Sequence, residues 1–248
     1  MAEMRVSYIV SAYRCAEFIK ARIENLLDTW EFNQGSAEIV VVNASPTDDE
    51  HQIILPFIKF GVVYIRTKRE PIYVSWNRGI RIAQGRYIMN ANADDRIFSE
   101  TPSRMADLLD RDESVGVVYT DMVATKTPNP TREEFEPSDN PYYPPGHGWP
   151  DFDPMFMLRQ CYTGPFPMWR RALHVQYGLF DEGYQLAGDY EFFLRLAAHG
   201  VQFKHMSISG GLYYDAGASI RNQDLTAAES RRAVLQWSKK ILEQSNHS

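Results

Sequence analysis

Short apolar runs alternate with segments of helical periodicity through the first 120 residues. The apolar runs are nearly continuous, as in parallel strands that are buried on both faces. Strands are expected at 6–10, 38–42, 62–65, 87–89 and 115–119, and helices at 17–30, 51–60, 74–83 and 105–110. This alternation predicts an α/β fold in which a mostly parallel, doubly wound central sheet is flanked by helices.

The alternation breaks after Asp121. Residues 126–154 hold eight prolines, interleaved with aromatic and acidic residues. We expect the segment near 122–160 to be an ordered excursion beside the active site, with a domain linker as the alternative. Helical periodicity returns at 189–199 and at 226–244. The last helix carries basic residues beside an apolar face, which indicates packing on the domain or, alternatively, peripheral contact with a membrane surface.

Length and charge exclude several classes of protein. The chain has 248 residues, enough for one large domain, and a formal net charge of −6. An acidic chain is unsuited to general nucleic-acid binding, which needs clustered positive charge. Its two cysteines form no paired motif, and no stretch approaches the ~20 apolar residues that span a bilayer. With no signal peptide evident either, we expect a cytoplasmic protein that is soluble or at most peripheral.

A cluster of amide and acidic side chains follows the strand expected at 87–89. The segment reads Asn90-Ala91-Asn92-Ala93-Asp94-Asp95. Ligands of open α/β sheets bind outside the carboxyl ends of the strands. Hard cations such as Mg²⁺ take oxygen ligands, often one or two carboxylates together with substrate phosphates. The cluster therefore favours a metal–diphosphate site, with a polar turn as the alternative.

Five segments, taken in order, resemble the family 2 glycosyltransferases with the GT-A fold. They are 6–14, similar to the family's opening strand and turn; 39–48, similar to IVVDDGSTD; 75–88, similar to ARNxGI..A.GEYI; 92–95, at the place of the DxD motif; and 178–195, similar to GxFDE and the acidic EDxxxxxR helix. Each motif is weak alone, but their order and spacing are specific.

The resemblance implies one Rossmann-like GT-A domain over residues 1–248. Its nucleotide-binding half would be 1–121, its acceptor-binding half 122–225, and a C-terminal helix would follow at 226–248. The implied activity moves a sugar from a nucleoside-diphosphate sugar to the hydroxyl of a saccharide or other acceptor, as in polysaccharide or glycan assembly. It would depend on a divalent cation, Mn²⁺ or Mg²⁺, and would invert the anomeric centre.

Three aspartates carry the implied chemistry. Asp94 matches the family's main metal ligand, and Asp95 would be a second carboxylate or a supporting group. For Asp95, capping of a following helix is the alternative. Asp189 matches the family's catalytic base, which takes the proton of the attacking hydroxyl. It would lie at the start of the helix expected at 189–199, where the dipole favours an anion, and a plain helix cap is its alternative.

The nucleotide is expected to contact five further residues. By carry-over, Ser11, Tyr13 and Asn43 would line the base or the ribose, although Tyr13 could instead belong to the core. Asn92 would touch the ribose or a metal-bound water. Arg78 would approach the diphosphate, since a guanidinium suits phosphate oxygens, and an exposed helix arginine is its alternative.

Acceptor selection is expected to fall to the proline- and aromatic-rich excursion. Trp149 within it and Trp169 beyond it are the candidate contacts, because ligand sites are largely apolar with a few placed polar groups. For Trp169, the packed start of a helix is the alternative reading.

Three positions depart from the family pattern. Asn43 and Asn92 are amides where the family has aspartates, and Gly188 stands where the family has a glutamate before the base. The amides leave the nucleotide base open and keep a non-catalytic nucleotide-sugar-binding module as an alternative. A sugar nucleotidyltransferase is another alternative, but residues 11–15 lack the glycine-rich basic loop that it would need after the first strand.

Overall fold

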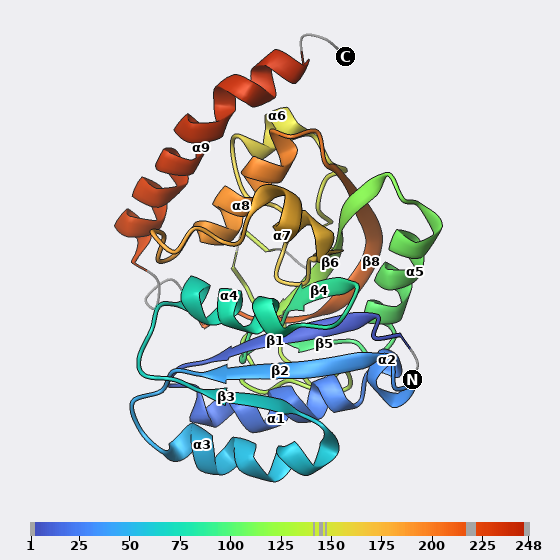
Figure 1. Ribbon diagram of the computed structural model, residues 1–248, viewed down its shortest axis with the longest axis vertical. Coiled ribbons are helices and arrows are strands. Elements are labelled where there is room, and N and C mark those ends of the chain that lie inside the picture. The colour runs from blue at the N-terminus through green and yellow to red at the C-terminus, as the bar shows by residue number, and fades with distance from the viewer. Residues whose placement is uncertain (1–2, 141, 144–145, 147, 217–221, 246–248) are drawn as a thin grey trace.

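The computed structural model describes residues 3–140, 142–143, 146, 148–216 and 222–245. Within them the chain forms a single α/β domain around one 8-stranded sheet, in the order β3-β2-β1-β4-β7-β6-β8-β5 (Figure 1). The strands are β1 (Val6–Ala12), β2 (Ala37–Asn43), β3 (Val63–Arg66), β4 (Tyr87–Asn90), β5 (Arg96–Ile97), β6 (Val115–Thr125), β7 (Met168–Arg170) and β8 (Gln202–Tyr214).

Helices cover both faces of this sheet. The expected helix at 51–60 is divided into an α-helix and a 3₁₀ helix, because Pro56 cannot donate a backbone hydrogen bond. The helices are α1 (Ala16–Leu27), α2 (Trp30–Asn33), α3 (Asp49–Ile54), η1 (Leu55–Phe60), α4 (Ile72–Ile82), α5 (Thr101–Arg111), α6 (Pro154–Met157), α7 (Ala172–Tyr177), α8 (Gly188–Ala197) and α9 (Gln223–Ser245).

The first four strands are parallel, and β1, β2 and β4 are buried on both faces, whereas β3 at the edge of the sheet is partly exposed. Figure 1 shows α4 on one side of β1 and β2, and α1 and α3 on the other. Successive residues of β1 alternate between the two cores, so that Ile9 packs with α4 and Tyr8 packs with α1. Ala12 pairs with Asn43, which brings the carboxyl ends of β1 and β2 to the same edge. These strands confirm the parallel sheet expected from the sequence.

The second half of the sheet departs from a doubly wound order. β7 lies antiparallel between β4 and β6, and β5 pairs antiparallel with β8 at one edge. Trp169 therefore belongs to a strand, and a short helix, α7, follows it. The sequence pattern does not identify β8, although β8 forms the long parallel ladder with β6.

The excursion after β6 is packed against the domain where it is described. Thr125 bridges to Pro137, and Lys126 donates its backbone N–H to the carbonyl of Glu136. Further along, Trp149 and Phe152 pack against the core. These contacts support the expectation of an ordered excursion over that of a free linker.

The C-terminal helix α9 packs on α8, as Figure 1 shows. Ala233 and Ile241 are buried in the interface, and Trp237 donates its indole N–H to Glu191 on α8 (2.9 Å). Leu235 remains exposed on the outer face. Among the described residues, no helix combines the length and apolar character required to cross a bilayer.

Candidate functional site

The candidate site begins at the carboxyl edge of the parallel strands. The turn after β4 carries the acidic cluster, and its two neighbouring aspartates have different environments. Asp95 is 1% exposed, and its carboxylate accepts hydrogen bonds from the Asn92 amide (2.9 Å) and the Tyr214 backbone N–H (3.1 Å). Asp94 is half-buried, and no described residue donates a hydrogen bond to its carboxylate or pairs with it. Asp95 therefore holds the turn, and Asp94 is left available to a ligand.

Two buried arginines lie behind this turn. Arg96 donates to the backbone carbonyls of Ala93 (2.9 Å) and Asp95 (2.6 Å), and Arg22 is fully buried with its Nε unpaired. Burial, and then the charge of Arg96, lower the pKa of Arg22 to about 9. Burial, and then the charge of Asp94, raise the pKa of Asp95. Asp95, Arg96 and Arg22 thus form a set of charges held away from water behind the more accessible Asp94.

The donor set at this turn is small. Among the described residues, no group of three or more His, Cys, Asp and Glu side chains could hold a metal ion by itself. Mg²⁺, however, is commonly bound by one or two carboxylates and completed by substrate phosphates and water. The unpaired carboxylate of Asp94 fits a cation shared with a diphosphate. It does not fit a closed structural metal site.

The turn after β1 presents an aromatic ring between two cations. The guanidinium carbons of Arg14 and Arg69 lie 5.5 and 5.7 Å from the centroid of the Tyr13 ring. Arg14 adopts φ +48°, so that the chain turns sharply here without a glycine. Ser11, at the end of β1, is half-buried beside this turn. Cations at the carboxyl edge of the sheet suit a phosphorylated ligand.

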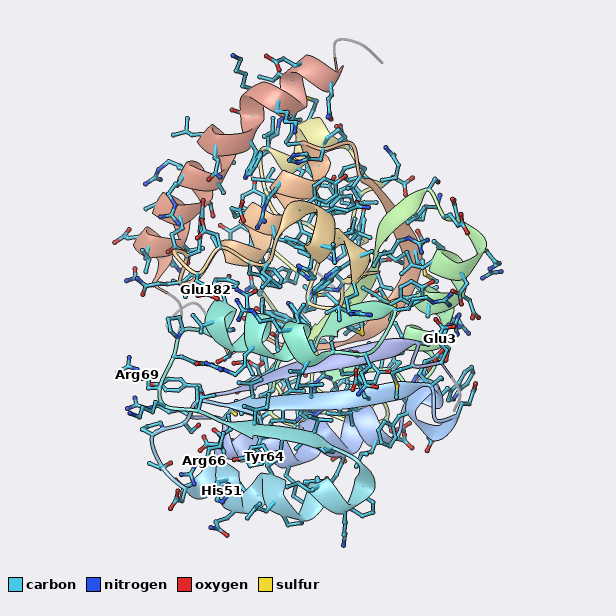
Figure 2. The ribbon with its side chains drawn as sticks, in the orientation of Figure 1. Glu3, His51, Tyr64, Arg66, Arg69 and Glu182 are labelled. Atoms are coloured by element: carbon cyan, nitrogen blue, oxygen red, sulfur yellow. The ribbon has the colours of Figure 1, made fainter. Side chains whose placement is uncertain are left out.

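Asn43 is less accessible than its motif suggests. It is 0% exposed, its Oδ1 accepts the backbone N–H of Ser45 (2.9 Å), and its Nδ2 donates to the Tyr64 hydroxyl (3.1 Å). The Tyr64 hydroxyl lies 2.9 Å from His51 Nδ1. Figure 2 shows His51, Tyr64 and Arg69 toward the same side of the molecule. The Asn43 amide is therefore a buried support for the chain at the end of β2. Tyr64 and His51 lie nearer to solvent.

Arg78 is engaged in an ion pair on α4. Its Nε and Nη2 donate to the two carboxylate oxygens of Glu70, at 3.1 and 2.8 Å. The neighbouring Asn77 joins α4 to the segment before α8, because its amide donates to the carbonyl of Phe180 (2.9 Å) and accepts the Phe180 N–H (3.0 Å). The structure thus gives Asn77 a structural role and places Arg78 on the surface.

Asp189 lies in the first turn of α8. Its Oδ1 accepts hydrogen bonds from the Tyr73 hydroxyl (3.2 Å) and the Tyr190 backbone N–H (2.8 Å). Gly188, which precedes it, leaves no room for a side chain. A Cβ at Gly188 would come within 2.7–2.8 Å of three carbons of the Tyr73 ring. Burial and the neighbouring Asp189 charge raise the pKa of Tyr73 above its ordinary range, so that Tyr73 stays a hydrogen-bond donor.

A cavity of about 420 Å³ brings part of the predicted site together. Asn92, Asp189 and Trp149 line it, although they come from the β4–β5 turn, α8 and the excursion. Trp169 does not reach the cavity. It is 0% exposed, packs against the aromatic core, and donates its indole N–H to His174 Nε2 (2.8 Å).

Three residues at this site carry no signal in the family motifs. Tyr73 contacts Asp189, Arg159 lines the cavity, and Glu229 on α9 accepts the backbone N–H groups of residues 185–187 at 2.8, 2.8 and 2.9 Å. Each acts on a segment that is distant in sequence, so periodicity and local motifs do not reveal it. Glu229 does not stand out either, because α9 also contains Asp224 and Glu243.

Comparisons with known proteins identify the family of this chain. The model of "Glycosyl transferase family 2" matches residues 7–168. A chondroitin synthase of Pasteurella multocida (strain Pm70) is 25% identical over 225 residues, which cover 88% of this chain and 22% of that protein. The chain spans 19–28% of the length of this and two similar synthases.

Solved structures show the same fold. S. aureus TarS 1–349 in complex with UDP superposes with a TM-score of 0.69 at 18% identity, covering 93% of this chain and 64% of that one. The mannosyltransferase PcManGT from Pyrobaculum calidifontis, in complex with GDP-Man and Mn²⁺, gives a TM-score of 0.62 at 17% identity, covering 98% and 64%. Since the family model matches well over half of its length and the GT-A architecture is present, this chain belongs to glycosyl transferase family 2, a family of transferase enzymes.

Proposed function

We propose that this chain is a metal-dependent, inverting glycosyltransferase that moves a sugar from a nucleoside-diphosphate sugar to an acceptor hydroxyl. One observation carries the proposal: a single cavity is lined both by Asn92, from the turn that presents Asp94, and by Asp189 at the start of α8. A transferase must bring a leaving diphosphate and a proton acceptor to opposite sides of one sugar. The turn after β4 supplies Asp94 for the diphosphate side, and α8 supplies Asp189 as the proton acceptor.

Asp94 would hold the donor through a divalent cation that it shares with the diphosphate. When bound, such a cation supplies Lewis-acid stabilisation of the charge that develops on the leaving group. Asn92 lines the cavity and its amide donates to Asp95, and it would face the donor. Tyr13, flanked by Arg14 and Arg69, would bind the nucleotide, with Ser11 beside it. Arg78 and Trp169 have no part in this arrangement.

Asp189 would accept the proton of the attacking hydroxyl. The Tyr73 hydroxyl and the Tyr190 N–H fix the orientation of its carboxylate, and Trp149 forms part of the wall against which the acceptor lies. Attack from the side opposite the diphosphate inverts the anomeric centre. The chondroitin synthase relative supports assembly of a glycan as the setting, and the UDP and GDP-Man complexes of the structural neighbours support a nucleotide-sugar donor.

Thermal unfolding with a panel of nucleoside diphosphates and nucleotide sugars tests the proposal. At least one nucleotide should raise the melting temperature in the presence of Mn²⁺, because a ligand that binds only the folded state stabilises it. Asp94→Ala should remove the Mn²⁺-dependent part of that rise, whereas Asp28→Ala, at an exposed carboxylate after α1, should leave it unchanged. If no nucleotide shifts the melting temperature with metal present, the proposed function fails.

Asp189→Asn separates an enzyme from a binding module. This variant should keep metal-dependent nucleotide binding and lose sugar transfer, since an amide cannot take the proton. Full transfer by Asp189→Asn would remove Asp189 as the base. Nucleotide binding without transfer by the wild-type chain to any acceptor would favour the non-catalytic module.

A further inference from the structure

Arg159 has no role in the family motifs or in the mechanism above, yet it lines the cavity that holds Asp189. Of the described residues that line this cavity, Arg159 and Asp189 are the two that carry a charge. Arg159 is exposed, and its guanidinium forms no ion pair or hydrogen bond with any residue in the described ranges. A guanidinium stays charged at neutral pH and offers five N–H donors. The cavity is therefore lined by a permanent positive charge that has no partner among the described residues.

The position of Arg159 points to the acceptor rather than to the leaving diphosphate. Arg159 follows α6 by two residues, and α6 packs against α8 and α9. Figure 1 shows α6 beside α9 at the top of the molecule, whereas β4 lies near the centre. The diphosphate would lie at the turn after β4, where Asp94 is available. Arg159 thus reaches the cavity from a different part of the fold than Asn92, and we assign it to the acceptor rather than to the diphosphate.

Part of the wall of the same cavity is aromatic. Tyr143, Trp149 and Tyr213 line the cavity, with ring centroids 6.5 Å apart for Tyr143–Trp149 and 5.5 Å apart for Tyr143–Tyr213. Pockets of this kind combine apolar faces with a few polar groups that fix orientation. A sugar ring offers a matching apolar face, and Arg159 adds a requirement for negative charge.

An anionic acceptor would need a positive charge such as Arg159 in the cavity, because other charges of the protein repel it. Asp189 must be ionised to accept a proton, and the whole chain has a formal net charge of −6. Both would repel an anion that approaches the cavity. A single guanidinium in the same cavity offsets the Asp189 charge where the acceptor binds.

We propose that Arg159 binds an anionic group of the acceptor saccharide, either a sugar carboxylate or a phosphodiester. This group would lie next to the sugar unit whose hydroxyl attacks the donor. The inference rests on the proposed function, because it assigns the acceptor end of the same cavity. It adds a substrate class: the acceptor is an acidic glycan.

Calorimetric titration of the full chain, saturated with Mn²⁺ and the nucleoside diphosphate that stabilises it, tests this assignment. The probes are an unsulfated glucuronate-containing tetrasaccharide, a glycerol-phosphate tetramer and a neutral N-acetylglucosamine tetrasaccharide. One of the two anionic probes should bind more tightly than the neutral one, and the probe that binds identifies carboxylate or phosphodiester. Arg159→Gln should weaken that binding by about ten- to a hundred-fold, as for loss of a hydrogen bond to a charged group. It should leave the neutral probe unaffected.

Matched variants complete the test. Arg159→Lys should recover part of the affinity, because it keeps the charge and loses the planar fork. Arg111→Gln, at an exposed arginine on α5, should change nothing. The assignment is overturned if neither anionic probe binds the wild type, or if Arg159→Gln weakens neutral and anionic probes equally. It also fails if Arg159→Gln weakens nucleotide binding instead. Nucleotide-induced stabilisation is measured separately, so failure of this inference is distinguishable from failure of the proposed function.

Discussion

At the scale of single residues, Tyr73 and Gly188 form a matched pair. The ring of Tyr73 occupies the volume in which a side chain at residue 188 would lie, and its hydroxyl reaches Asp189. The departure from the family pattern at residue 188 therefore has a steric cause. An aromatic residue from α4 takes over the space before the candidate base and supplies a hydrogen bond to it.

Tyr73→Phe should lower kcat by about ten-fold or more and leave donor binding unchanged. The variant keeps the ring that packs against Gly188 and removes one hydrogen bond to a charged group, which is typically worth about 1.5–3 kcal/mol. Tyr8→Phe is the control, because Tyr8 is equally buried and donates to Thr29 on the other face of the sheet (3.1 Å). Steady-state kinetics with the donor identified by thermal unfolding gives the answer. An unchanged kcat in Tyr73→Phe would show that the hydroxyl does not position Asp189.

The residues of the candidate site were predictable from the sequence only where a local motif holds them. Asp94 and Asp189 follow from the order of the family motifs, and both lie where a ligand can reach them. Asn43 and Trp169 match the expected types, but other segments of the chain bury both. Tyr73 and Arg159 come from segments with no motif. Their roles depend on tertiary packing, which a local pattern does not encode.

At the scale of elements, α9 is connected to the candidate base through one side chain. Glu229 is buried and accepts three consecutive backbone N–H groups from residues 185–187. That segment ends at Ala187, which immediately precedes α8. The helix thus does more than cover an apolar face of α8. It holds the loop that leads into α8, where Asp189 lies in the first turn.

Glu229→Ala should lower the free energy of unfolding by about 3 kcal/mol or more, since each buried N–H left without a partner costs about 1–3 kcal/mol. For a chain of this size the melting temperature should fall by roughly 6 °C or more. Hydrogen–deuterium exchange should show faster exchange at residues 185–187. Glu243→Ala is the control, because its exposed pairing with Lys239 (3.9 Å) contributes little. Unaltered exchange at 185–187 in Glu229→Ala would contradict this coupling.

Among the elements, the first five expected strands and the helices between them were predictable, because continuous apolar runs and helical periodicity are local signals. β8 was not, although its residues alternate between buried and exposed along part of its length. Polar residues and two glycines obscure its strand character. A Cβ at Gly210 would clash with the Thr120 side chain, and one at Gly211 with the Arg96 carbonyl. These glycines let β5 and β6 approach β8, a requirement that only the assembled sheet reveals.

At the scale of the whole molecule, two buried groups make stability depend on pH with opposite signs. His174 Nε2 accepts the Trp169 indole N–H, so its proton lies on Nδ1, which donates to the Gly178 carbonyl (3.1 Å). Burial lowers the pKa of His174 to about 4 from 6.5. Asp95 is the reverse case, since burial and the charge of Asp94 raise its pKa above 3.8.

The sign of each contribution follows from proton binding. The unfolded chain protonates His174 near pH 6.5 and the folded chain does so near pH 4, so the stabilisation from His174 is complete above pH 6.5 and is lost as pH falls to about 4. The shift corresponds to a change on the order of 3 kcal/mol. For Asp95, whose folded pKa is raised, stabilisation is complete below pH 3.8 and is lost as pH rises.

Urea unfolding between pH 4 and pH 7 separates the contributions of His174 and Asp95. The quantity to compare is the slope of the free energy of unfolding against pH, which has opposite signs for the two groups. The free energy of unfolding of the wild type relative to His174→Gln should increase by about 3 kcal/mol from pH 4 to pH 6.5. Relative to Asp95→Asn, it should decrease over the rising pH range. A general loss of stability in either variant would displace its curve without changing this slope. If the His174→Gln curve runs parallel to the wild type, His174 is not held neutral by the fold. If the Asp95→Asn curve runs parallel to the wild type instead, Asp95 is ionised as readily in the folded chain as in the unfolded one. The turn that presents Asp94 would then be more open to water than its packing indicates.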